Sequence, residues 1–226
     1  VVAILYQPLY GVVQHSVDRL LSGMSYEYMK ALRDYSQIIN RITDLNELAV
    51  KSITLIGHAL GIERGALLTI EREEGRPNLL LRVIPGMGVI DAFPTEMPPK
   101  HPWLRYFQET GSPLLQRDID RLAEFAAMPA QDKRWLHSLG MAVYVPVKST
   151  EGLIGILALG PRGANNPYYS TDLELLATLG DQTVLALRNA QQFADLTALN
   201  AGIAQLNEEL RRLDESKSNF LAIASH

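Results

Sequence analysis

Residues 141–160 read MAVYVPVKSTEGLIGILALG and contain the clearest hairpin in the sequence. Two apolar runs, MAVYVPVKS (141–149) and GLIGILALG (152–160), are joined by the turn TEG (150–152). Short apolar runs rich in β-branched residues predict strands, and a connection of this length predicts antiparallel pairing. An antiparallel sheet is therefore the expected centre of the fold.

The preceding segments extend this sheet. GALLTIER (65–72) and NLLLRVIP (78–85) read as strands separated by the hairpin signal EEGRP (73–77). A long irregular loop is expected from Pro85 to Pro102. The later segments predict a short helix, a short strand and a helix that Pro129 interrupts, over HPWLRYFQETG (101–111), SPLLQRDID (112–120) and 121–140 in turn.

Two helices are expected before the first strand in the sequence. Residues from about 24 to 42 carry an apolar stripe at steps of three and four, formed by Tyr28, Leu32, Tyr35, Ile39 and Ile42. A second helix begins at a capping box of Asp44 and Glu47 and ends at Gly61. His58 on this helix is expected to be a structural histidine.

The last helix is expected to run from Ser170 to His226, about 85 Å at ~1.5 Å per residue, with Thr171 and Glu174 as its capping box. Apolar positions from Leu199 to Leu213 alternate by four and three residues, and the flanks are charged. This spacing predicts a coiled-coil seam. The alternative is a helix that packs on the core of its own domain. If the seam forms, we expect a parallel homodimer in which two copies pair through the stripe from Leu199 to Leu213 and the stripe from Tyr28 to Ile42.

Composition excludes several classes of function. The formal net charge is −4 and no basic stretch occurs, so no nucleic-acid partner is expected. The chain has no cysteine, which excludes disulfides, thiolate metal sites and cysteine nucleophiles and favours a reducing compartment. The apolar start VVAIL is too short to span a bilayer. It is either the inner end of a membrane helix or a short stub, and we expect a cytoplasmic segment of a membrane-anchored protein.

Residues 44–190 resemble a GAF domain. The features that carry the resemblance are ALGIERGALLTIE (59–71), VYVPVKS (143–149), GLIGILALG and the closing helix YYSTDLELLATLGDQTVLALRNA (168–190). The resemblance implies an α+β fold with an antiparallel sheet of five or six strands. The first and last helices lie on one face, and loops and short helices that can enclose a ligand cover the other.

The tail LDESKSNFLAIASH (213–226) resembles the phosphoacceptor box of sensor histidine kinases, whose pattern is Lys-Ser-x-Phe-Leu-Ala-x-x-Ser-His. The matching residues are Lys217, Ser218, Phe220, Leu221, Ala222, Ser225 and His226. His226 would then be the phosphorylated histidine. The ATP-binding domain of the family is absent from the segment, so ATP and magnesium would act in the full-length kinase only, with a response regulator as partner.

The two resemblances divide the chain into four parts. Residues 1–23 form a juxtamembrane segment, 24–43 an N-terminal signalling helix, 44–190 the GAF sensor domain and 191–226 a coiled-coil helix that leads into the phosphotransfer helix.

The GAF resemblance also implies a pocket for an unknown small-molecule signal. Trp103, Asp118 and Tyr144 lie on segments that face this pocket in the family, and His137 is a candidate ligand contact. Packing or surface positions are the alternative for each. We expect no covalent chromophore and no metal, because cysteines are missing and the histidines are scattered.

Two other functions fit the same residues. The domain could be the GAF regulatory module of a cyclic-nucleotide enzyme or a transcription activator, or a ligand-free structural spacer that only dimerises. The residues that follow His226 in the full-length protein distinguish these from a kinase.

Overall fold

In the computed structural model, the described residues are 28–72, 75–90, 93–163 and 166–224, without the side chains of 214–224. The predicted juxtamembrane segment and His226 lie outside them. A helix over residues 28–39 comes first. The elements that follow are α2 (Leu45–Leu60), β1 (Gly65–Arg72), β2 (Leu79–Met87), β3 (Thr95–Met97), α3 (Pro102–Thr110), β4 (Leu114–Leu115), α4 (Gln116–Arg121), the 3-10 helix η1 (Ala123–Phe125), α5 (Ala130–Ser138), β5 (Val143–Ser149), β6 (Gly152–Leu159) and α6 (Ser170–Ala224).

The strands form one six-stranded sheet in the order β3-β2-β1-β6-β5-β4. Every neighbouring pair is antiparallel. The β5–β6 hairpin closes at the pair Ser149↔Gly152, which confirms the hairpin predicted for residues 141–160. The fold class, an antiparallel sheet flanked by helices with a long C-terminal helix, is thus confirmed.

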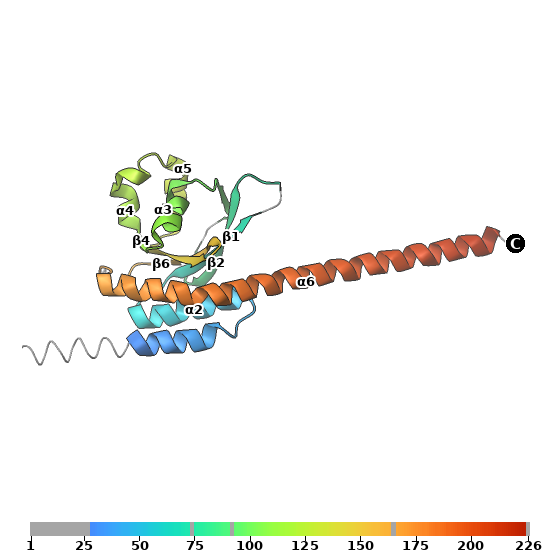
Figure 1. Ribbon diagram of the computed structural model, residues 1–226, viewed down its shortest axis with the longest axis horizontal. Helices are drawn as coiled ribbons and strands as arrows, with labels where there is room; N and C mark the ends of the chain where they lie inside the picture. The colour runs from blue at the N-terminus through green and yellow to red at the C-terminus, as the bar shows by residue number, and fades with distance from the viewer. Residues whose placement is uncertain (1–27, 73–74, 91–92, 164–165, 225–226) are drawn as a thin grey trace, which may run out of the picture.

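Side chains of the central strands alternate between two apolar layers, as the period of two in a strand requires. Val143, Val145 and Leu157 point to the layer that contains residues 28–39, α2 and α6. Tyr144 and Ile156 point to the opposite layer, under α3, α4, η1 and α5. Figure 1 shows these helices on the two sides of the sheet.

Two glycines let the helices of the first layer approach the sheet closely. A Cβ atom at Gly180 in α6 would lie 2.6 Å from the carbonyl oxygen of Pro146 in β5. A Cβ atom at Gly86 in β2 would lie 2.6 Å from the carbonyl oxygen of Ala49 in α2. Any larger residue at either position would push a helix away from the core.

The helix over residues 28–39 packs on this layer, so one sequence-based prediction is wrong. The stripe from Tyr28 to Ile42 was expected to form part of a dimer seam. Instead Tyr35, Ile39 and Ile42 are buried in the domain's own core. The physical reason is that α2 and α6 already offer an apolar surface next to this stripe, which is therefore covered within one chain.

Two further expectations are corrected in the middle of the chain. The segment from Pro85 to Pro102 is not all loop, because β2 continues to Met87 and β3 lies within it. The strand predicted over residues 112–120 is limited to β4, and the helix α4 begins directly after it at Gln116. Both strands are short or lie at the sheet edge, where few residues carry the alternating pattern.

The helix ends follow the predicted chemistry in part. Asp44 Oδ1 accepts a hydrogen bond from the Glu47 amide at 2.8 Å, and Gly61 ends α2 with φ 67°, as predicted. At the start of α6 the capping box of Thr171 and Glu174 is wrong, because Asp172 Oδ2 accepts from the Tyr169 amide at 2.9 Å.

The helix α6 is a single element of 55 residues, about 82 Å long at ~1.5 Å per residue. Its last sheet-layer core residue is Ala190, and the helix continues far beyond the sheet (Figure 1). The predicted uninterrupted helix is confirmed as far as Ala224.

Candidate functional site

An aromatic cluster fills the layer under α3 and α5. Trp103 is fully buried, and its ring meets those of Tyr144, Phe107 and Trp135 edge-on, with centroids 5.3, 5.4 and 6.4 Å apart. Edge-to-face pairs of this kind add stability beyond the area they bury. Trp103 and Tyr144, both predicted to face a ligand, are thus brought into direct contact.

The hydroxyl of Tyr144 is held by polar groups at the edge of this cluster. It lies 2.9 Å from Gln116 Oε1 and 3.2 Å from the Leu136 carbonyl oxygen, either of which can accept its proton. Burial raises the pKa of Tyr144, and the nearby Asp120 carboxylate raises it further. The phenol therefore stays neutral and acts as a hydrogen-bond donor.

A buried histidine lies at the start of α3 and was not singled out by sequence reasoning. His101 is 2% exposed, and its Nε2 lies 3.1 Å from Asp132 Oδ2 at the start of α5. Burial lowers the pKa of His101, while the hydrogen bond and charge of Asp132 act in the opposite direction. Within the described residues, His101 Nδ1 and Trp103 Nε1 are buried without a hydrogen-bond partner. Because the Asp132 carboxylate accepts the proton of Nε2, Nδ1 of the neutral ring is an acceptor, whereas Trp103 Nε1 is a donor. The two nitrogens could therefore accept from and donate to a polar ligand in this layer.

The other predicted ligand residues lie on the surface. His137, near the end of α5, is exposed, and its Nε2 lies 3.0 Å from Asp120 Oδ1. Asp118 in α4 lies 3.8 Å from Arg117, also at the surface. The structure brings neither side chain into the aromatic cluster. His58, expected to be structural, is exposed on α2, so that prediction is wrong.

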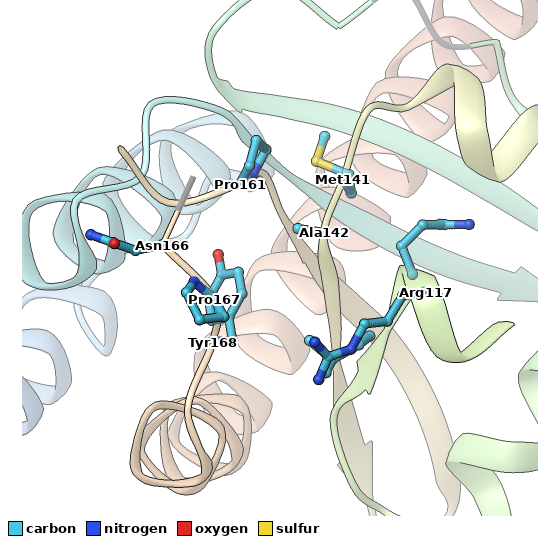
Figure 2. Close-up of a pocket in the computed structure, with 9 residues that line it drawn as sticks. Arg117, Met141, Ala142, Pro161, Asn166, Pro167 and Tyr168 are labelled. Carbon is cyan, nitrogen blue, oxygen red and sulfur yellow. The ribbon is translucent and has the colours of Figure 1, made fainter. Parts of the chain in front are cut away.

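A pocket of about 310 Å³ lies between α4 and the connection from β6 to α6. Figure 2 shows Pro161, Pro167 and Tyr168 of this connection opposite Met141 and Ala142. The Tyr168 hydroxyl donates to the Gly160 carbonyl at 2.6 Å, and burial raises its pKa. The pocket lining is mainly apolar and the tyrosine hydroxyl is already bonded, so a small apolar group is what fits here.

A buried carboxylate with several hydrogen-bond partners lies at the start of α6. Asp172 is 1% exposed and receives a hydrogen bond from Tyr28 at 2.8 Å on Oδ1. On Oδ2 it receives one from Arg162 at 2.6 Å, in addition to the Tyr169 amide. Arg162 also donates from Nε to the Leu60 carbonyl at the end of α2. One carboxylate thus joins the helix over residues 28–39, α2 and α6, and we call these three side chains (Tyr28, Arg162 and Asp172) the Asp172 junction.

A second link connects the helix over residues 28–39 to α6, about two turns further along the first helix and about three turns further along α6. The hydroxyls of Tyr35 and Thr183 lie 2.6 Å apart in the core, and Thr183 also donates to the Leu179 carbonyl at 2.7 Å. Burial raises the pKa of Tyr35, so the phenol is neutral. The helix over residues 28–39 is therefore joined to α6 by two hydrogen-bonded contacts, one partly buried and one buried.

Comparisons with known protein families and solved structures agree with this architecture. The family model described as GAF domain matches residues 44–189. The chain belongs to the GAF domain family. No curated protein sequence matches the chain.

Solved structures share the fold of this GAF domain at low sequence identity. A methyl-accepting chemotaxis protein, residues 122 to 287, is 19% identical with a TM-score of 0.50, over 73% of this chain and 99% of that one. The GAF domain of an Acinetobacter phosphoenolpyruvate-protein phosphotransferase is 14% identical with a TM-score of 0.51, over 73% and 94%. The GAF domain of the cyanobacteriochrome TePixJ is 14% identical with a TM-score of 0.50, over 68% and 94%.

The chain therefore contains a GAF domain, a sensory and signalling module, whose C-terminal helix α6 has 55 residues. Within its described residues, no three His, Asp or Glu side chains lie close enough to hold a metal ion. The expectation that the GAF domain carries no metal and no chromophore stays a prediction.

Proposed function

We propose that this chain is the sensory and signal-transmitting region of a two-component sensor histidine kinase. In this proposal the GAF domain dimerises through α6, and α6 passes the state of the domain to the phosphoacceptor His226. The observation that carries the proposal is an apolar stripe on α6 that no described part of its own chain covers.

This stripe, the α6 seam, consists of Leu196, Leu199, Ile203, Leu206, Leu210 and Leu213, which are 48–62% exposed. Their spacing of three and four residues places them in one line along the helix. Leu185, beside the sheet, is in phase with the line and is also exposed. The alternative, a helix covered by its own core, does not fit these exposures.

A second copy of the chain is the partner that fits the α6 seam best. An isolated helix gains little stability in water without tertiary packing. Burying each leucine fully is worth about 1.5–3 kcal/mol, and a regular seam is complementary to itself. Asn189 and Gln192 occupy seam positions near the domain, and polar residues at such positions specify register.

The sequence at the end of α6 supports the kinase as the output. The segment from Lys217 to Ser225 matches the phosphoacceptor box at six positions, and His226 would be the seventh. Neutral imidazole is a competent nucleophile near neutral pH, and its attacking nitrogen needs no separate base. The γ-phosphate of ATP, with magnesium, would come from the catalytic domain of the full-length protein. A parallel dimer brings both histidines to the same end.

The proposal extends to the cellular setting and to the phosphate acceptor. We place the segment on the cytoplasmic side of a membrane-anchored protein, where a response regulator receives the phosphate from His226. In the described part of the chain, no helix has both the length and the apolar character that a membrane crossing needs. The signal in this proposal is a small molecule bound on the α3–α5 side of the sheet, where His101 Nδ1 offers an acceptor and Trp103 Nε1 a donor.

The test is an insertion experiment in the full-length protein. One residue inserted after Leu199 rotates the helix downstream by about 100°, whereas seven residues keep the α6 seam in phase. We expect the single insertion to abolish regulated autophosphorylation at His226 and the seven-residue insertion to retain it. Equal regulation in both variants would show that α6 does not carry the signal. Absence of phosphate on His226 in the unmodified protein would refute the kinase assignment itself.

A further inference from the structure

A second cleft lies at the end of the sheet where β1 begins and β2 ends. Its volume is about 440 Å³, and it is lined in part by Arg64, Gly88, Gly140 and Arg162. These residues come from the start of β1, the end of β2, the approach to β5 and the β6–α6 connection. None of them belongs to the aromatic cluster, so this cleft is separate from the layer under α3 and α5.

Three glycines lie directly against Arg64. A Cβ atom at Gly140 would lie 2.5 Å from Arg64 Nη1, and one at Gly160 would lie 3.0 Å from Arg64 Cβ. Gly88 approaches the Arg64 backbone in the same way, with 3.4 Å from a Cβ to Arg64 Cα. Gly140 has φ +65° and Gly88 has φ +74°, a conformation that other residues rarely adopt. Glycine at these positions therefore leaves room for the Arg64 side chain.

Among the residues that the structure describes, no acidic side chain pairs with Arg64. Arg64 is half-buried, and in the described residues its guanidinium forms no hydrogen bond and no ion pair. A guanidinium offers five N–H donors in a planar fork. Partial burial of such a group without an acceptor is unfavourable, and an oxyanion is the acceptor that matches the fork.

Arg162 adds a second positive charge to the same cleft. Two of its donors are used, by Asp172 and by the Leu60 carbonyl, and its other guanidinium nitrogen, Nη2, remains. Among the described lining residues, Glu63 is the only acidic one, and it is exposed. The cleft thus carries two arginines against one surface glutamate.

We propose that this cleft binds a small molecule through an oxyanion group, either a carboxylate or a phosphate, with Arg64 as the principal contact and Arg162 as the second. Charge-assisted bonds to a guanidinium fork are the strongest hydrogen bonds that a site of this size can offer. The volume is sufficient for a metabolite and too small for a macromolecule.

The position of the cleft connects it to the signalling helix. Arg162 reaches from the cleft to Asp172, so an anion that attracts Arg162 acts directly on the Asp172 junction and on the start of α6. This regulatory consequence rests on the proposed function, whereas binding itself does not.

The test is a titration of the 226-residue chain followed by amide NMR shifts. Inorganic phosphate and succinate are added in separate arms at constant ionic strength kept with sodium chloride. We expect saturable shifts centred on the amides of Gly88, Gly140 and Gly163 in at least one arm, and the arm that saturates identifies phosphate or carboxylate as the preferred group. In Arg64→Gln the affinity should fall about tenfold or more.

Arg105→Gln is the matched control, because it removes the same charge from an exposed position on α3. The proposal is overturned if neither anion gives saturable shifts, if the shifts centre elsewhere, or if both variants weaken binding equally. If Arg64→Gln does not fold, the location of the shifts in the unchanged protein still shows whether the anion binds in this cleft. Dimerisation is measured separately, so failure of this proposal and failure of the proposed function are distinguishable.

Discussion

Replacement of Asp172 by alanine is expected to lower the free energy of unfolding by about 3 kcal/mol, because it removes one partner of a buried ion pair. Arg162, whose side chain is 22% exposed, would lose its carboxylate, and the Tyr28 hydroxyl and the Tyr169 amide would each lose an acceptor. Urea unfolding at one fixed protein concentration measures the loss, since dimerisation makes stability depend on concentration.

Asp181→Ala is the control for this prediction. Asp181 lies on the same helix but is exposed, and no change beyond about 0.5 kcal/mol is expected. If the two variants have the same stability, the Asp172 junction does not hold the helix over residues 28–39, α2 and α6 together.

The second large effect concerns the dimer. Leu206→Glu should weaken dimerisation by about a hundredfold or more, because in a parallel pair two carboxylates would meet at one layer of the seam and lose water. Leu206 is in the middle of the α6 seam and 61% exposed in the single chain, so the domain itself should remain folded. Sedimentation equilibrium measures the dissociation constant, and circular dichroism checks the fold.

Gln205→Glu adds the same charge one residue away, at a position that points out of the seam. It should leave the dissociation constant nearly unchanged. An equal effect of the two substitutions would mean that α6 does not associate through the line from Leu196 to Leu213.

Sequence reasoning was accurate where a pattern is local. The hairpin of β5 and β6, the Asp44 cap and the continuity of α6 all depend on residues close together in the chain. The stripe from Tyr28 to Ile42 shows the limit of such patterns. Periodicity identifies an apolar face of a helix, but it does not tell which surface covers that face, and here α2 and α6 cover it.

The polar contacts could not be predicted for a different reason. His101 and Asp132 are 31 residues apart, and Tyr28 and Asp172 are 144 apart, so the fold alone brings them together. No spacing rule links such pairs. Trp103 and Tyr144 could be named in advance because the family resemblance places their segments on one side of the sheet. The same resemblance did not indicate that His137 and Asp118 lie at the surface.

The central claim is that two copies of α6 associate in parallel along the α6 seam, and a cysteine scan tests it most directly. The chain contains no cysteine, so each introduced one is unique. Leu199→Cys, Ile203→Cys, Leu206→Cys and Leu210→Cys place a thiol in the seam, whereas Ala198→Cys, Ala201→Cys and Gln205→Cys place it outside. Under mild oxidation we predict rapid disulfide-linked dimers at all four seam positions and slow formation at the other three, because only a parallel, in-register pair brings identical seam residues together. Uniform formation at all seven positions, or formation at a single seam position as in an antiparallel pair, would contradict the claim.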